Sequence, residues 1–187
     1  MDRKTIEAAA LELFHKNGYD AVKVQDICDA CGITKPTFYH YVPSKDDILL
    51  RYYDEAVETV EQHVAGTDPE GPASQILGAY LAIIEECERI GPDLLSRILT
   101  SNLQNNYGSF NTRSAITERM SQIIRTGQET GELGSARDAG DLYFSTAYLF
   151  EGLQFMWCVN KGDFDWRRKL REGLRAILGV GEPLPEE

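Results

Sequence analysis

The side chains best suited to binding chemistry lie in one short stretch, residues 34–45. Hydroxyl groups and cations donate to phosphate oxygens, and a lysine also donates to the O6 and N7 atoms of guanine. The apolar residues expected to face inward are Ile27, Ile33, Phe38 and Val42. The residues left to face outward are Lys35, Thr37, Tyr39, His40 and Tyr41. Exposed aromatic residues are rarely this dense on a merely solvated helix, so the pattern favours a nucleic-acid contact.

Three predicted helices position this stretch. A short helix carrying Ile27 ends at Gly32, and Thr34 then caps a second helix that has Pro36 in its first turn. Pro43 ends that helix, and Ser44 with Asp47 three residues on begins a long one. A bracing helix, a tight turn and a short second helix form a helix-turn-helix, in which the second helix enters the major groove.

This region resembles the tetracycline-repressor (TetR) family of bacterial regulators. The resemblance covers about the first 50 residues and rests on segments 8–14, 17–19, 27–28, 31–34, 35–42 and 44–49. It implies that DNA is contacted by Gln25, Thr34, Lys35, Pro36, Thr37, Tyr39, His40, Tyr41 and Lys45. Tyr41 and Lys45 lie at the family's usual phosphate contacts, and Lys35 is the first choice for a guanine contact.

The remainder of the chain shows helical periodicity without convincing strand alternation. We expect an all-α fold of about nine helices: an N-terminal three-helix DNA-binding domain followed by a helical ligand-binding and dimerisation domain. The predicted boundaries are 1–48 for the first, 49–180 for the second and 181–187 for a frayed tail. Breaks are expected in the loop at 65–72 and at Gly108.

Residues 141–160 are apolar nearly all round, so this helix must be covered on more than one side. We expect one face to meet a second copy of the chain, joined by the last helix as the resemblance implies. The expected dimer contacts are Ser145, Leu149, Gly152, Met156, Trp166, Leu170, Leu174 and Ile177. A plain core without a dimer is the alternative.

The other face of this segment predicts a ligand pocket, lined by Tyr80, Phe144, Tyr148, Glu151 and Phe155. A carboxylate among aromatic side chains is costly to bury unless it is paired or protonated. Glu151 is therefore a candidate anchor for a cationic or hydrogen-bond-donating molecule. It is equally able to pair with Arg97 or Arg125, or to lie at a wet edge.

Composition excludes several classes of protein. The net charge is −11, yet residues 1–51 hold seven Lys and Arg against eight Asp and Glu, so the acidic excess lies mainly beyond them. No apolar run is long enough for a membrane span and the N-terminus lacks signal-peptide features, so a cytoplasmic protein is expected. Nucleophile elbows, phosphate loops and metal-ligand clusters are absent from the sequence, so we expect neither an enzyme nor a cofactor.

Isolated reactive residues have ordinary interpretations. Cys28 and Cys31 are expected to be small buried hydrophobes, with oxidation sensing as the alternative. His15, His40 and His63 lie on separate helices without ligand spacing. The basic run at 167–171 is interpreted as a solvated helix face.

The resemblance implies a ligand-responsive repressor that binds a palindromic DNA operator as a homodimer and releases it when a small molecule binds. The alternative is a DNA-binding or adaptor protein without a transcriptional role that uses the same head.

Overall fold

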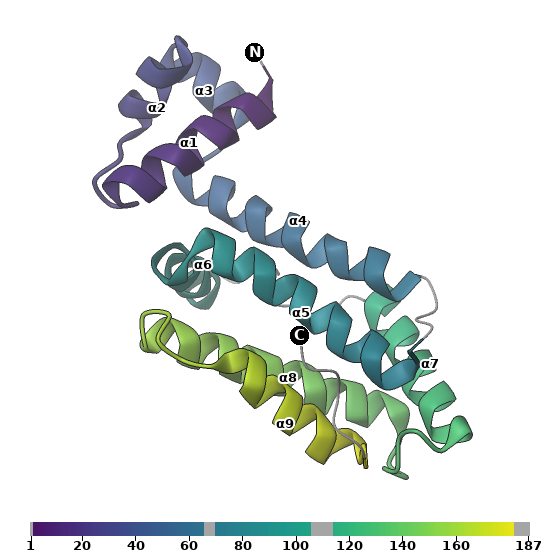
Figure 1. Cartoon of the computed structure of the whole chain (residues 1–187). Helices are drawn as coiled ribbons and strands as arrows, with labels where there is room; N and C mark the ends of the chain where they lie inside the picture. Colours follow the sequence, from purple (N-terminus) through teal and green to yellow (C-terminus); the bar gives the residue numbers. More distant parts are fainter. Residues whose placement is uncertain (1, 66–69, 106–113, 182–187) are drawn as a thin grey trace. The chain divides into compact units, whose positions relative to one another are not determined.

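The computed structural model describes residues 2–65, 70–105 and 114–181. These residues form nine α-helices and, within the described ranges, no strand, which confirms the all-α prediction (Figure 1). The helices are α1 (Arg3–Asn17), α2 (Val24–Cys31), α3 (Lys35–Tyr41), α4 (Lys45–Ala65), α5 (Pro72–Ile90), α6 (Pro92–Asn105), α7 (Ser114–Thr130), α8 (Ala139–Val159) and α9 (Trp166–Leu178). The predicted break at Gly108, residues 66–69 of the predicted loop and all but Gly181 of the predicted tail lie outside the described residues.

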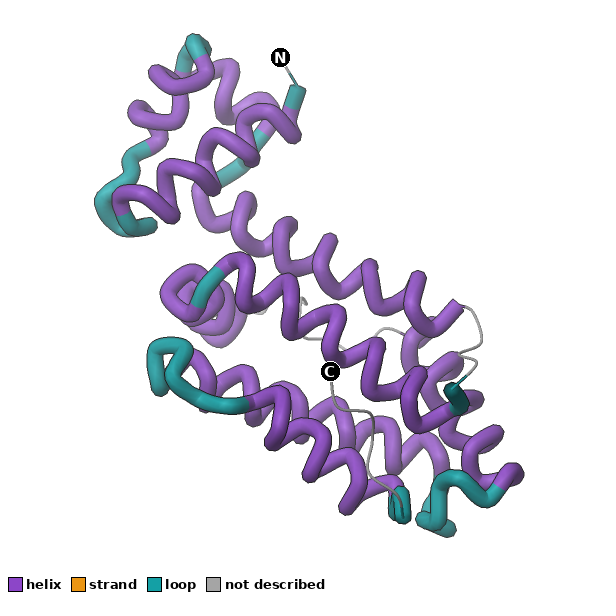
Figure 2. The backbone as a smooth tube through the Cα atoms, in the orientation of Figure 1, coloured by secondary structure: helices purple, strands orange, loops and turns teal. Residues whose placement is uncertain are grey.

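The helices divide between two compact units. The head unit comprises residues 2–55 and 96–105, and the second unit comprises residues 56–65, 70–95 and 114–181. The division falls inside α4 and inside α6, so each of these helices contributes residues to both units. Figure 2 shows the helices and the loops between them.

The head unit has a small apolar core at helical spacing. Ile6, Ala10 and Phe14 of α1 are buried. Gly18 ends α1 with φ +81°, a backbone conformation that favours glycine. Ile48 at the start of α4 is also buried. This core fixes α1 and the first turns of α4 beneath the helix-turn-helix.

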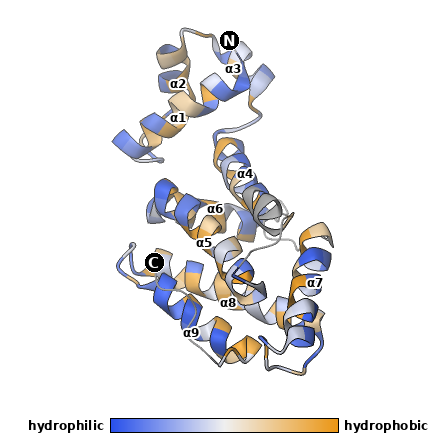
Figure 3. Cartoon of the chain, turned by 45° about the vertical axis from the view of Figure 1, so that its right-hand side comes forward, coloured by the Kyte–Doolittle hydropathy of each residue, from blue (hydrophilic) through white to orange (hydrophobic). Residues whose placement is uncertain are grey.

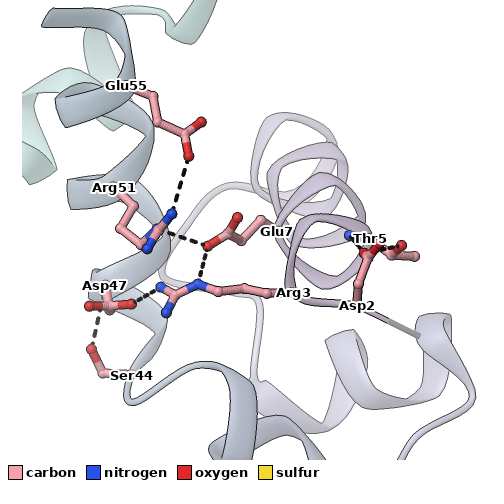
Figure 4. Close-up of polar contacts among 8 residues, drawn as sticks. All are labelled: Asp2, Arg3, Thr5, Glu7, Ser44, Asp47, Arg51 and Glu55. Carbon is pink, nitrogen blue, oxygen red and sulfur yellow. Dashed lines mark hydrogen bonds and ion pairs between the residues drawn. The ribbon is translucent and has the colours of Figure 1, made fainter. Parts of the chain in front are cut away.

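A chain of ion pairs on the surface of the head joins α1 to α4 (Figure 4). The Arg3 guanidinium lies 2.6 Å from Glu7 and also binds Asp47. Arg51 lies 3.4 Å from the same Glu7 carboxylate and 3.3 Å from Glu55. Single surface pairs contribute little, but a connected network restrains the two helices more than isolated pairs do.

The second unit contains α5, α7, α8 and α9, with apolar side chains buried between them. A row of aromatic rings crosses this core: Tyr80 stacks on Phe150 at 5.3 Å between centroids, Phe150 on Trp166 at 6.2 Å, and Trp166 on Trp157 at 4.7 Å. The Trp166 indole donates to Glu88, which also pairs with Arg167 at 2.8 Å. Helix α9 shows both hydrophilic and hydrophobic colours along its length (Figure 3), as an amphipathic helix does.

Candidate nucleic-acid interface

The turn between α2 and α3 has the geometry of a helix-turn-helix. Helix α2 ends at Gly32, which adopts a left-handed conformation with φ +64°. The Ile33 amide then donates to the Cys28 carbonyl at 2.9 Å, which closes the turn. A non-glycine residue at position 32 is strained in this conformation, so glycine permits the sharp change of direction.

Helix α3 is capped and anchored as the sequence predicts. The Thr34 hydroxyl accepts from the Thr37 amide at 3.4 Å, and Pro36 occupies the first turn. Phe38 and Val42 are both fully buried. Together they hold one face of α3 against the head core and leave the opposite face in solvent.

The outward face of α3 carries most of the predicted DNA-contact residues. Thr34, Lys35, Pro36, Tyr39 and His40 are exposed, and Tyr39 keeps 53% of its surface in solvent. Thr37 and Tyr41 are half-buried. The α3 helix therefore exposes a lysine, an imidazole and a phenol to solvent.

Gln25 lies in the first turn of α2 and is exposed, with its amide donating to Asp29 at 2.7 Å. The α2 N-terminus is capped by Asp26, whose carboxylate accepts from the Lys23 amide at 2.7 Å. The first helix of the motif therefore has a defined start, although no serine or threonine precedes it.

Lys45 does not project from this surface. Its ammonium donates to the backbone carbonyls of Tyr19 at 2.7 Å and Val22 at 2.8 Å. It also lies 3.8 Å from the centroid of the Tyr19 ring. Burial lowers the pKa of this ammonium below its usual range, although Asp20 and Asp46 oppose that shift. In this structure Lys45 ties the start of α4 to the connection between α1 and α2, and its predicted phosphate contact stays a prediction.

Tyr19 is the centre of a polar cluster that the sequence does not reveal. Its hydroxyl donates to Asp46, and the Arg97 guanidinium of α6 lies 5.0 Å from its ring. Arg97 also lies 3.6 Å from Asp46 and 3.9 Å from Asp20. Burial and the bond to Asp46 raise the pKa of Tyr19, so it remains a neutral donor. The sequence offers Arg97 only as a partner for Glu151, because spacing along the chain carries no signal for a contact between α6 and the head.

The charge around α3 suits a polyanion better than the net charge of the chain does. No Asp or Glu lies between Asp29 and Asp46 in the sequence, although the chain has 30 acidic residues. This interval includes the turn, all of α3 and the start of α4. Helix α3 therefore carries no acidic side chain that would repel a phosphate group.

The predicted ligand-pocket residues do not all lie in the core of the second unit. Tyr80 is buried and its hydroxyl lies 2.8 Å from the Thr146 hydroxyl. Tyr148 and Phe155 are instead exposed, at 64% and 55%. Phe144 and Glu151 are half-buried, and Phe144 stacks on Tyr148 with centroids 6.2 Å apart. Burial raises the pKa of Glu151. The positions on α8 thus split between the core and the surface.

The predicted dimer residues also divide into two groups. Ser145, Gly152 and Met156 of α8 are exposed, and Leu149 and Ile177 are half-buried. Trp166, Leu170 and Leu174 are instead buried within the second unit of a single chain. The dimer contact expected of these three residues stays a prediction, and the exposed dimer candidates are those on α8.

Cysteine, histidine and acidic residues show no metal-binding cluster within the described part of the chain. Cys28 is buried and Cys31 half-buried, and burial raises the pKa of both thiols. The His63 side chain lies outside the described residues. Among the described helices, none qualifies as a membrane-spanning segment.

The fold and the α2–α3 geometry define a helix-turn-helix protein. Comparison with known proteins shows which family model and which proteins the chain is similar to. Residues 6–52 match the family model "Bacterial regulatory proteins, tetR family". The chain is 30% identical over 108 residues to the uncharacterised HTH-type transcriptional regulator YerO of Bacillus subtilis, a match that spans 54% of this chain and 36% of YerO. It is 24% identical over 186 residues to the HTH-type transcriptional regulator UidR of Escherichia coli K12, covering 95% of this chain and 91% of UidR.

Solved structures share the fold along the whole chain. Thermus thermophilus FadR, a TetR-family repressor crystallised with lauroyl-CoA, matches with a TM-score of 0.70 at 22% identity over 99% of this chain and 100% of that one. Salmonella enterica GusR matches with a TM-score of 0.66 at 20% identity over 95% of each chain. The N-terminal quarter of the chain thus matches the tetR family model, and the chain as a whole shares its fold with solved TetR-family proteins.

Proposed function

We propose that the protein is a sequence-specific DNA-binding regulator of transcription, a ligand-responsive repressor that binds a palindromic operator as a dimer. The observation that carries this proposal is the exposed face of α3, where Lys35, Tyr39 and His40 project from a helix fixed by buried Phe38. Side chains placed in this way on a capped short helix reach base edges and phosphates of the major groove.

Lys35 is the residue we assign to base recognition. Its ammonium is exposed at the N-terminal end of α3, the end that contacts base edges in this motif. Tyr39, His40, Thr34 and Thr37 supply further donors beside it. Lys45 positions α4 and the α1–α2 connection, and its contribution to binding is indirect.

A second copy of the chain is proposed to pair through the exposed face of α8. Tyr148, Phe155, Met156 and Val159 are large apolar residues that remain 41–64% exposed in the single chain. Ser145 and Gly152 lie at matching helical spacing and permit close helix approach. Pairing along this face would bring two heads to successive major grooves about one DNA turn apart.

We place the effector site in the second unit, where half-buried Glu151 forms no ion pair within the described ranges of the chain. The T. thermophilus relative with lauroyl-CoA is an example of a small-molecule complex on this fold. An effector acts by binding one dimer conformation more tightly than another. Helix α6 contributes residues to both units, and its Arg97 pairs with Asp46 inside the head unit.

The experiment that tests the proposal selects duplexes from a random DNA pool with the purified protein at moderate salt. We expect enrichment of a two-fold-symmetric site with half-sites about one turn apart. A control selection uses the Tyr39→Ala/His40→Ala variant, which keeps Phe38 and the α3 cap. Failure of folded, dimeric wild-type protein to enrich any site, while retaining DNA affinity, would favour a non-specific DNA-binding role.

A further inference from the structure

Figure 2 shows the loop between α7 and α8. Residues of this loop and of α7 line a hollow on the second unit that the proposed DNA and effector sites do not use. Its volume is about 520 Å³, within the range typical of small-molecule sites. The lining residues are Arg125, Gln128, Leu133, Gly134, Ser135, Ala136, Arg137, Asp138 and Ala139. Two arginines therefore face one hollow in a chain whose net charge is −11.

The walls of this hollow are held by hydrogen bonds. The Gln128 amide donates to the carbonyls of Ser135 at 2.7 Å and Arg137 at 2.8 Å, so the loop is fastened to α7 next to Arg125. The Leu133 amide donates to Gly127 at 3.0 Å, and the Leu133 side chain is buried. These hydrogen bonds therefore hold the loop that carries Arg137 against α7.

The loop is also fastened to the end of α9. The amides of Gly134 and Ser135 donate to the carbonyls of Gly179 and Leu178, each at 3.1 Å. Gly179 has φ +71°, and a Cβ there would lie 2.8 Å from the Ser135 nitrogen. The sequence thus keeps a glycine where the backbone of α9 must approach the loop.

One acidic residue, Asp138, also lines the hollow, and it forms no ion pair with Arg125 or Arg137. Asp138 caps α8, and its carboxylate accepts from the amides of Gly140 at 2.8 Å and Asp141 at 3.2 Å. Within the described part of the chain, the side chains of Arg125 and Arg137 have neither an ion pair nor a hydrogen bond, and both are exposed. The guanidinium groups of Arg125 and Arg137 are therefore available to bind an anion in the hollow.

We propose that this hollow binds a small organic anion with two oxyanion groups, one for each of the guanidinium groups of Arg125 and Arg137. Guanidinium forks bind phosphate and carboxylate oxygens through paired hydrogen bonds, which a lysine does not reproduce. The chain as a whole carries a net charge of −11, so binding of a compact dianion requires local cations such as these two arginines. The site is separate from α3 and from Glu151.

Calorimetric titration of the full chain with pyrophosphate at low salt tests this site, with citrate and orthophosphate as separate arms. We expect saturable 1:1 binding per chain, and binding weakened about tenfold or more in the Arg125→Gln/Arg137→Gln variant. The matched control is Arg89→Gln/Arg168→Gln, which removes the same charge from arginines already paired with Glu86, Asp165 and Glu172. Circular dichroism verifies that both variants fold.

The arms distinguish the possible ligands. Pyrophosphate bound more tightly than citrate indicates an organic phosphate, and the reverse order indicates a polycarboxylate. Orthophosphate bound as tightly as both would contradict a two-group site. Absence of binding by the wild-type chain, or equal weakening in the control variant, would overturn the proposal without touching DNA recognition by α3.

Discussion

Replacing Lys45 with methionine separates a structural role from a DNA contact. Methionine keeps an unbranched apolar side chain in the same position, while the substitution removes the ammonium. The bonds that disappear are those to the Tyr19 and Val22 carbonyls, at 2.7 and 2.8 Å, together with the cation over the Tyr19 ring. All of these interactions lie inside the head unit.

The expected decrease in stability follows from these interactions. A hydrogen bond to a charged group contributes about 1.5–3 kcal/mol, and a cation–π contact about 0.5–2 kcal/mol. Because Lys45 is only partly buried, water can reach the freed carbonyls, and the total falls below the roughly 3.5 kcal/mol to which the lower limits of these contributions add. We expect the free energy of unfolding to decrease by about 2 kcal/mol, which lowers the melting temperature by about 4–8 °C in a chain of this size.

Urea denaturation measures the decrease, and the salt dependence of DNA affinity identifies its origin. A structural Lys45 leaves the slope of log K against log salt unchanged at temperatures where the variant is folded. If Lys45 instead neutralised a DNA phosphate, its removal would reduce that slope by about one. The matched control is Lys35→Met, whose exposed side chain should leave stability within about 0.5 kcal/mol. A Lys45 variant of unchanged stability with a reduced salt slope would refute this reasoning.

Two further substitutions test the second unit. Gly179→Ala places a side chain in a left-handed backbone conformation and against the Ser135 nitrogen. Urea denaturation should therefore show that the free energy of unfolding falls by about 2–4 kcal/mol. A decrease below about 0.5 kcal/mol would contradict the tight approach of the end of α9 to the loop. Burial raises the pKa of Glu151 above 4.5, so its charged form is disfavoured in the folded state at neutral pH. Glu151→Gln should therefore raise the melting temperature at pH 7, and the gain should vanish as the pH falls below 4.5. A stabilisation that persists in acid would point to packing as its cause.

The amphipathic helices can be predicted from the sequence because each buries one face. Ile76, Tyr80, Ile83 and Cys87 recur at helical spacing, and all four are buried in α5. The same holds for Ile116, Met120, Ile123 and Ile124 in α7. The caps at Thr34 and Ser44 are also predictable, since each is set by a hydroxyl and an amide three residues on.

Helix α8 cannot be oriented in the same way because it is apolar nearly all round. Tyr148 and Phe155 are exposed, whereas the polar residues Thr146 and Gln154 are fully buried. Thr146 is satisfied by Tyr80, and the Gln154 amide donates to the Cys87 sulfur at 3.4 Å. Such partners come from another helix, and periodicity within one helix carries no information about them.

The residues of the candidate DNA surface also differ in whether local spacing predicts their positions. Exposure of Lys35, Tyr39 and His40 follows from the burial of Phe38 and Val42 on the opposite face of α3. The inward position of Lys45 depends instead on carbonyls that lie 26 and 23 residues earlier in the chain. Local spacing therefore predicts the recognition helix, while the role of the residue that fixes α4 emerges only in the folded head.

The most direct test of sequence recognition by α3 is a repeat of the duplex selection with the Lys35→Ala variant. If the exposed lysine donates to a guanine, the variant should relax base preference at one position in each half-site and leave the rest of the site unchanged. The expected loss of discrimination at that position corresponds to about 1–3 kcal/mol. An unchanged base preference, with affinity reduced equally for all sequences, would contradict the account and reduce Lys35 to a phosphate contact.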